Sequence, residues 1–209
     1  GEKMLKVWGR KTSSNVRKVL WCLAELNLEF DRVDLGGPFG GNDDPAYRAI
    51  NPNGLVPTLE DGDTIIWESN SIIRYLSSIH GKGTLWPEDP AERSEADRWM
   101  DWQLFALNST VGFIFRETTR KEEADWDQDA IAEAKQAAIV YIKMLDAHLA
   151  DRPFVAGENL TMGDIPVGFF INRWKLLDLD HPALANLDAW HDRLKARPGY
   201  KTHITDNGL

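Results

Sequence analysis

The chain has 209 residues, 43 % hydrophobic and 27 % charged, so it can bury one large core or two smaller ones and is not expected to be disordered. Its net charge of −9 argues against a nucleic-acid groove, and no run approaches the ~18 apolar residues of a membrane span. The single cysteine, Cys22, excludes an intramolecular disulfide and a cysteine-based metal cluster. We therefore expect no bound metal and a reducing, cytoplasmic compartment.

The first part of the chain alternates strand and helix patterns. Residues 4–9, MLKVWG, form a short apolar run that ends in glycine and predict a strand. N-cap residue types at 13–15 then begin a helical pattern that ends near Asn27. Residues 28–35 alternate apolar and polar side chains and predict a second strand, whereas residues 36–45 are rich in glycine and proline and predict a loop.

A hairpin pattern and a helix pattern follow. Two short apolar runs within residues 56–67 flank Asp61 and Gly62, which is a good hairpin signal, and residues 70–81 are helical and end on Gly81. The strand–helix–strand order gives a parallel pair, and the hairpin adds an antiparallel pair. The sequence therefore predicts a mixed four-stranded sheet with helices packed on it.

Strand patterns disappear beyond residue 82. Residues 82–90 contain two prolines and predict a linker. Helical patterns then cover four segments, residues 91 to about 118, 128–150, 163–177 and 183–200. We expect an α/β domain in residues 1–81 joined by the linker to an all-α domain, a helical bundle, in residues 91–209.

The start of the first helix carries the first candidate site. Ser13, Ser14 and Asn15 follow Thr12, and such hydroxyls most often act only as helix caps. However, a helix N-terminus offers unpaired N–H groups and the positive end of the helix dipole, which favour an anion. A hydroxyl donor there would lower the pKa of a bound thiol from its usual value of about 8.5.

Two further features flank the predicted hairpin. The segment from Asn51 to Pro57 is either a simple turn or carries a cis Val56–Pro57 bond that leaves the Val56 backbone free to bind a peptide ligand. Glu68 and Ser69 open the next helix, where they are either a solvated side chain and a cap or a grip for an amino-acid head group. In the second case Glu68 meets the ammonium, and Ser69 with the helix end meets the carboxylate.

In this order and spacing, the features resemble a known family. Residues 51–76, NPNGLVPTLEDGDTIIWESNSIIRYL, resemble the glutathione-binding half of cytosolic glutathione transferases, and the strand–helix–strand start resembles their thioredoxin-like domain. The resemblance implies that Pro57 is cis, that Val56 pairs with the cysteinyl backbone of glutathione, and that Glu68 and Ser69 hold the γ-glutamyl group. It also implies a role in detoxification, with glutathione as co-substrate.

The residue that activates the thiol is chosen by the same resemblance. Ser13 stands four residues before Arg17, as in bacterial-type members with a serine-type active site, although Ser14 and Asn15 could also reach the sulfur. No cysteine lies in this segment, which disfavours a mixed disulfide with the protein and a glutaredoxin-type oxidoreductase. Leu55 departs from the family pattern, because many relatives have lysine or glutamine there to contact glutathione.

The second half carries the remaining expectations. Thr161 and Asp164 resemble the family's buried capping motif, with Thr161 as the N-cap and no part in catalysis. The helix over residues 91–118 holds five aromatic residues, which are expected to serve the core, a partner subunit or the site of a hydrophobic electrophile: Trp99, Trp102, Phe105, Phe113 and Phe115. Trp102, Phe105 and Phe113 are expected to share one face.

The sequence thus predicts a homodimeric glutathione transferase that conjugates the glutathione thiolate to a small hydrophobic electrophile. Two alternatives stay open. One is a glutathione-dependent disulfide reductase or peroxidase on the same scaffold, and the other is a non-catalytic interaction module that kept only the fold.

Overall fold

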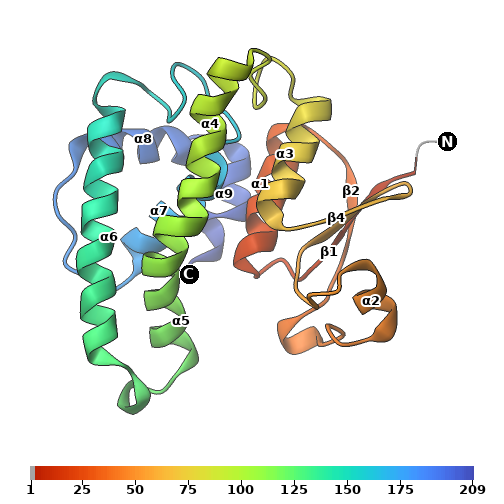
Figure 1. Cartoon of the computed structure of the whole chain (residues 1–209), viewed down its shortest axis with the longest axis horizontal. Coiled ribbons are helices and arrows are strands. Elements are labelled where there is room, and N and C mark those ends of the chain that lie inside the picture. Colours follow the sequence, from red (N-terminus) through yellow and green to blue (C-terminus); the bar gives the residue numbers. More distant parts are fainter. Residues whose placement is uncertain (1–2) are drawn as a thin grey trace.

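The computed structural model describes residues 3–209 and begins with a four-stranded sheet (Figure 1). Its strands are β1 (Leu5–Trp8), β2 (Phe30–Val33), β3 (Thr58–Asp61) and β4 (Thr64–Trp67), in the order β2-β1-β3-β4. β1 runs parallel to β2 and antiparallel to β3, and β3 pairs antiparallel with β4 across the hairpin turn. The predicted mixed four-stranded sheet is confirmed.

Three helices belong to this part of the chain: α1 (Ser14–Glu25), α2 (Pro45–Ile50) and α3 (Ser69–His80). α1 and α3 agree with the predicted helices, and α3 is followed by Gly81 as expected. The prediction of a single loop between the second and third strands was wrong, because it contains the short 3₁₀-helix η1 (Gly37–Phe39) and is followed by α2. With only six residues, α2 is too short to show a hydrophobic period.

The rest of the chain is helical. The predicted helix over residues 91–118 is one continuous run of three parts: α4 (Pro90–Trp102), the π-helix η2 (Gln103–Gly112) and α5 (Phe113–Arg120). The other helices are α6 (Gln128–His148), α7 (Asp164–Leu176), α8 (Ala185–Lys195) and α9 (Pro198–His203), with the short 3₁₀ segments η3 (Glu123–Asp125), η4 (Leu149–Asp151) and η5 (Thr205–Asn207).

The last predicted helix, over residues 183–200, is two helices in the structure. α8 ends at Lys195 and α9 begins at Pro198, and Arg197 between them has extended backbone angles. Proline lacks an N–H group and disfavours the helical conformation of the residue before it. Pro198 therefore ends one helix and opens the next.

α7 is the central helix of the structure, since every residue from Asp164 to Trp174 is buried. It packs against α1, α4 and η2, so one continuous hydrophobic core joins the sheet half to the helical half. Trp21 of α1 contributes to this core by stacking edge-on against Tyr200 of α9, with ring centroids 4.8 Å apart. All four strands end by Trp67, α3 ends at His80 and α4 begins at Pro90, while the domain division at residues 82–90 stays a prediction.

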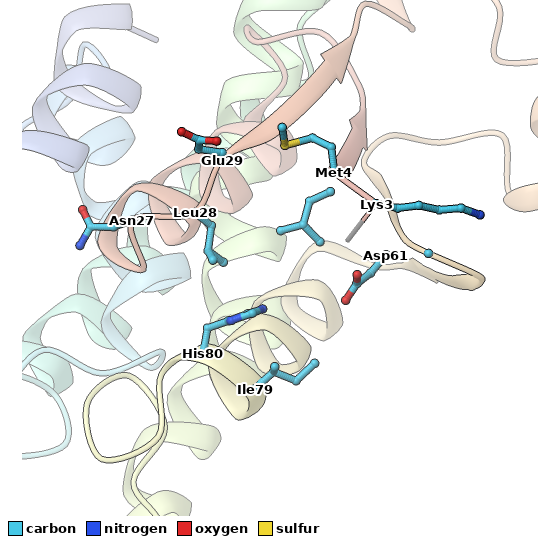
Figure 2. Close-up of a pocket in the computed structure, with 10 residues that line it drawn as sticks. Lys3, Met4, Asn27, Leu28, Glu29, Asp61, Ile79 and His80 are labelled. Carbon is cyan, nitrogen blue, oxygen red and sulfur yellow. The ribbon is translucent and has the colours of Figure 1, made fainter. Parts of the chain in front are cut away.

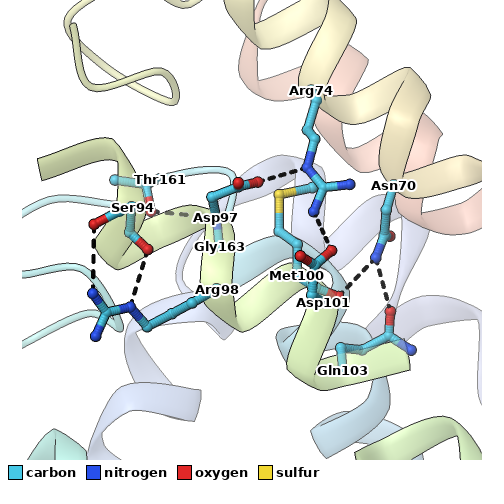
Figure 3. Close-up of polar contacts among 10 residues, drawn as sticks. All are labelled: Asn70, Arg74, Ser94, Asp97, Arg98, Met100, Asp101, Gln103, Thr161 and Gly163. Atoms are coloured by element: carbon cyan, nitrogen blue, oxygen red, sulfur yellow. Dashed lines mark hydrogen bonds and ion pairs between the residues drawn. The ribbon is translucent and has the colours of Figure 1, made fainter. Parts of the chain in front are cut away.

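A polar contact also joins α3 to α4 (Figure 3). Arg74 on α3 reaches across to two carboxylates on α4, Asp97 at 2.6 Å and Asp101 one turn further along. Because these side chains are partly exposed, the pairs contribute modestly to stability. They tie α3, whose start lines the candidate site, to α4. None of the helices in the described part of the chain has the length and hydrophobicity needed to span a bilayer.

Candidate functional site

The sequence-predicted residues meet around one small cavity of about 200 Å³. Its walls come from the start of α1, the segment before β3, the start of α3 and the π-helix η2. The lining residues are Asn15, Asn51, Asn53, Leu55, Val56, Pro57, Glu68, Ser69, Gln103, Leu104 and Asn108. Five of the seven predicted site residues therefore line a single cavity, although they are separated by more than fifty positions in the sequence.

The segment before β3 presents its backbone to the cavity. The Val56–Pro57 peptide bond is cis, as the resemblance implied. Asn51 orders this segment by donating from Nδ2 to the Leu55 carbonyl at 3.0 Å and to the Thr58 hydroxyl at 3.1 Å. Within residues 3–209 the Val56 N–H and C=O make no hydrogen bond, so both groups can pair with a ligand's backbone.

The start of α3 forms the opposite wall. Glu68 has a φ of +72°, a left-handed conformation that costs a non-glycine residue about 1–3 kcal/mol and that clusters at functional sites. Its side chain is exposed, whereas Ser69 beside it is only 5 % exposed and donates to Asn15 Oδ1 at 3.4 Å. The contact brings the starts of α1 and α3 together at the cavity.

The three candidates for thiol activation have different surroundings. Ser13 is 8 % exposed and, within residues 3–209, its hydroxyl makes no hydrogen bond, which leaves it free to donate to a ligand. Ser14 is engaged, because its hydroxyl accepts a hydrogen bond from Arg173 Nη1 at 2.7 Å. Asn15 lines the cavity, whereas Ser13 and Ser14 lie at the helix start beside it. The free hydroxyl favours Ser13 as the donor.

Sequence reasoning missed a buried cation beneath the cavity. Lys18 on α1 is fully buried, and its ammonium donates to Asn70 Oδ1 at 2.9 Å and to Gln103 Oε1 at 3.3 Å. Asn70 in turn donates from Nδ2 to the Met100 carbonyl and to Gln103 (Figure 3). Burial lowers the pKa of Lys18 to about 7, and the charge of Glu68 partly opposes that shift.

A lysine in a helical pattern normally indicates a solvated side chain, and the sequence analysis did not single out this position. The one available signal is that Lys18 stands three and four residues before Trp21 and Cys22, which share its side of α1 and are buried. Lys18, Asn70 and Gln103 tie three cavity-forming elements into one unit, since they lie on α1, α3 and η2.

Leu55 and the five aromatic residues of the long helix, both singled out in the sequence, take different places relative to the cavity. Leu55 lines the cavity and is 62 % exposed, so an apolar group stands where the resemblance led us to expect a polar contact. None of the five aromatic residues of the long helix is among the lining residues of the cavity. Instead, Trp102 and Phe105 both pack against Tyr141 of α6, with centroids 6.3 and 6.4 Å from it. From η2 the cavity receives Gln103, Leu104 and Asn108.

Thr161 and Asp164 form the predicted buried capping motif. The Asp164 carboxylate accepts from the backbone N–H groups of Thr161 and Val155 and from the indole of Trp190, each at 3.0 Å. The Thr161 hydroxyl accepts from the Gly163 N–H, and α7 begins at Asp164, so Gly163 and not Thr161 is the residue directly before the helix. Asp164 is fully buried and outside the cavity, which fits a structural role.

A larger hollow lies elsewhere, at the start of β1 and the ends of α1 and α3 (Figure 2). It has a volume of about 640 Å³ and its rim includes Lys3, Glu29, Asp61 and His80. It contains none of the predicted site residues. Cys22 is buried and unpaired, with its pKa raised to about 12 by burial, so it is a packing residue rather than a reactive thiol.

Comparison with known proteins decides the family. A model of the "Glutathione S-transferase, N-terminal domain" matches residues 12–79, and one of the "Glutathione S-transferase, C-terminal domain" matches residues 107–198. Glutathione S-transferase GstB of Escherichia coli K12 is 38 % identical over 200 residues, covering 95 % of this chain and 96 % of GstB. The chain belongs to the glutathione S-transferase family.

Solved glutathione S-transferases share the whole fold. The theta class enzyme of Xanthomonas axonopodis pv. citri, crystallised with glutathione bound, is 44 % identical with a TM-score of 0.91, and 97 % of each chain is covered. Transferase BmGSTD1 of Bombyx mori is 27 % identical with a TM-score of 0.86, covering 98 % of this chain and 94 % of that one. The thioredoxin-like sheet domain and the helical second half of this glutathione S-transferase are therefore those of the family.

Proposed function

We propose that this chain is a glutathione transferase that binds glutathione in the 200 Å³ cavity and transfers its thiolate to a small electrophile. The observation that carries the proposal is the arrangement around that cavity. The free backbone of Val56 matches the cysteinyl part of glutathione, which is itself a peptide, and Glu68 with Ser69 matches the γ-glutamyl head group. The named relatives are glutathione S-transferases, which supports the same reaction.

The roles of the residues follow from their surroundings. Ser13 donates its hydroxyl to the glutathione sulfur, and the N-terminus of the twelve-residue helix α1 adds its dipole, so the bound thiol has a pKa below its usual value of about 8.5. Asn15 connects this point to Ser69. The electrophile lies against η2, where Leu104 and Asn108 line the cavity.

Calorimetric titration with glutathione tests the binding site. We expect Glu68→Ala to weaken binding, because it removes the carboxylate that meets the ammonium, by about tenfold or more. Glu133→Ala, on the exposed side of α6, is the matched control and should bind as the unaltered chain does. The absence of binding at millimolar glutathione in the unaltered chain would leave a non-catalytic interaction module as the better account.

The ultraviolet absorbance of the bound thiolate tests the role of Ser13. A pH titration should give a higher thiol pKa in Ser13→Ala than in the unaltered chain, with Ser94→Ala on α4 as the control. If the thiol pKa rises in Ser14→Ala and not in Ser13→Ala, Ser14 is the donor. Assays with a disulfide and a peroxide separate the alternative activities, because a reductase turns these over faster than a haloarene.

We further propose that the chain acts as a cytoplasmic homodimer. Apolar side chains that a second copy would cover are exposed on η2 and α6, namely Phe105 at 72 % and Val140 at 67 %. Sedimentation equilibrium should give twice the chain mass, and Phe105→Ser should shift it toward the monomer. The unpaired state of Cys22 supports a reducing compartment.

A further inference from the structure

Four arginines gather where α1, α5 and α7 meet, although the chain as a whole carries a net charge of −9. Their positive charges act on one another, since Arg17, Arg116 and Arg120 all lower the pKa of Arg173. Within residues 3–209 no carboxylate lies within salt-bridge distance of any of the four. Arg17 and Arg173 are buried, whereas Arg116 is half-buried and Arg120 is exposed, so an anion bound beside the latter two would offset the repulsion among the four charges.

Arg173 is the most constrained of the four. It is only 4 % exposed, and its guanidinium carbon lies 3.5 Å from the centroid of Phe115 and 4.7 Å from that of Phe169. Its Nη1 donates to Ser14, but its buried Nε–H has no hydrogen-bond partner in the described part of the chain. Burial and its like-charged neighbours lower its pKa to about 9.

Arg17 differs from Arg173, because backbone carbonyls accept the hydrogen bonds of its guanidinium. Its guanidinium donates to the carbonyls of His203, Ile204 and Gly208, which fixes the end of the chain to α1. It therefore adds charge to the cluster without offering it to a ligand. Arg116, which is half-buried, and Arg120, which is exposed, are left as the cations that a small anion could reach, whereas Arg173 is buried.

The cluster adjoins the proposed electrophile side of the cavity at two points. Arg116 donates to the side chain and backbone oxygens of Asn108, at 3.3 and 3.4 Å, and Asn108 lines the cavity. Arg173 holds Ser14, whose neighbour Asn15 also lines the cavity. Both Arg116 contacts are long and leave its other N–H groups free to bind a ligand.

We propose that the electrophile subsite selects substrates that carry a carboxylate, which Arg116 and Arg120 bind while the reactive carbon faces the thiol. The guanidinium fork fits a carboxylate with two parallel hydrogen bonds. The inference rests on the proposed function, which it deepens. In the reaction, a C–S bond forms between glutathione and the reactive carbon, the carbon–halogen bond breaks, and the halide leaves with the electron pair. The thiol proton passes to solvent.

A matched pair of substrates tests this selection. 4-Chloro-3,5-dinitrobenzoate and 4-chloro-3,5-dinitrobenzamide share the leaving group and the ring and differ in charge, and each enzymatic rate is divided by its uncatalysed rate with glutathione. We expect the unaltered chain to favour the benzoate in kcat/KM. Arg116→Gln should lower kcat/KM for the benzoate by about tenfold or more and leave the benzamide nearly unchanged.

Three further variants sharpen the result. Arg116→Lys keeps the charge and should recover part of the preference for the benzoate. Arg120→Gln should lower that preference. Arg193→Gln on α8 should leave kcat/KM unchanged for both substrates. An equal loss for both substrates in Arg116→Gln would overturn the proposal, because the cluster would then serve the thiolate. Conjugation of both substrates without preference in the unaltered chain would also overturn it while the proposed function stands. Failure to bind glutathione would instead reject the proposed function.

Discussion

The buried ammonium of Lys18 gives the sharpest test of the structure, through the pH dependence of stability. The perturbation is Lys18→Met, which keeps the apolar stem of the side chain and removes the charge. Burial lowers the native pKa of Lys18 to about 7, against 10.5 for an ordinary lysine, and the charge of Glu68 opposes part of that shift. Within residues 3–209 its ammonium donates to the amide oxygens of Asn70 and Gln103. An unfolded chain returns this ammonium to water.

The sign of the effect follows from proton binding. Below about pH 7 lysine is protonated in both states, and the native state bears the full cost of burying the charge. Between about pH 7 and pH 10 the unfolded state binds more protons than the native state, so the free energy of unfolding rises with pH. At about 1.4 kcal/mol per pH unit, the unaltered chain gains about 2–3 kcal/mol between pH 6 and pH 9 relative to Lys18→Met.

The assay is urea unfolding of both proteins at several pH values from 6 to 9, read by tryptophan fluorescence. The difference between the two free energies of unfolding cancels the other titrating groups. A constant loss of about 1–3 kcal/mol from the unpaired Asn70 oxygen is expected in the variant, and it does not change with pH. Lys143→Met, on the exposed side of α6, is the control. If the free energies of unfolding of the unaltered chain and Lys18→Met change with pH in parallel, the lowered pKa of a buried Lys18 ammonium is refuted.

Two further substitutions separate the site from the scaffold. Gly9→Ala should destabilise the chain by about 1–3 kcal/mol and weaken glutathione binding, because a Cβ at this residue, whose φ is +148°, would lie 2.4 Å from Val16 and 3.1 Å from Val56. Gly157→Ala, at a φ of +135° with open space around it, should keep the affinity measured by calorimetry. Asp164→Ala should lower the free energy of unfolding by about 3 kcal/mol or more, since three buried donors lose their acceptor, while the thiol pKa with bound glutathione stays unchanged.

The main elements of the fold could be predicted because their patterns are local. Strand alternation, the Asp61-Gly62 turn and the helix ending at Gly81 each depend on a few neighbouring residues, and all three agree with the structure. The misses occur where local pattern is weak or misleading. α2 is too short for a period, and the π-helix η2 continues the helical pattern of α4 with a different geometry that hydrophobic spacing does not report.

The candidate site also has some features that could be predicted from the sequence and others that could not. The cis bond before Pro57 and the wall formed by Glu68 and Ser69 could be expected only from the resemblance to glutathione transferases, because the residues alone fit a simple turn and a helix cap equally well. Lys18 and Arg173 could not, since their importance comes from what surrounds them after folding. Lys18 is recognised as a buried cation only when the packing of α1 against α3 and η2 is known, and Arg173 only when the packing of α7 against α1 is known.

The distribution of charge links these observations. A chain with a net charge of −9 repels anions over most of its surface, and glutathione is itself an anion at neutral pH. Arg116 beside Asn108 places a positive charge with no carboxylate partner among the described residues at the edge of the cavity proposed to bind glutathione, and Lys18 lies beneath that cavity. Positive potential confined to a cleft attracts anions to that cleft and not to the rest of the surface. If glutathione and a carboxylate substrate bind as proposed, their negative charge offsets the cost of holding Arg116 and Arg173 without a carboxylate partner, and that gain contributes to affinity.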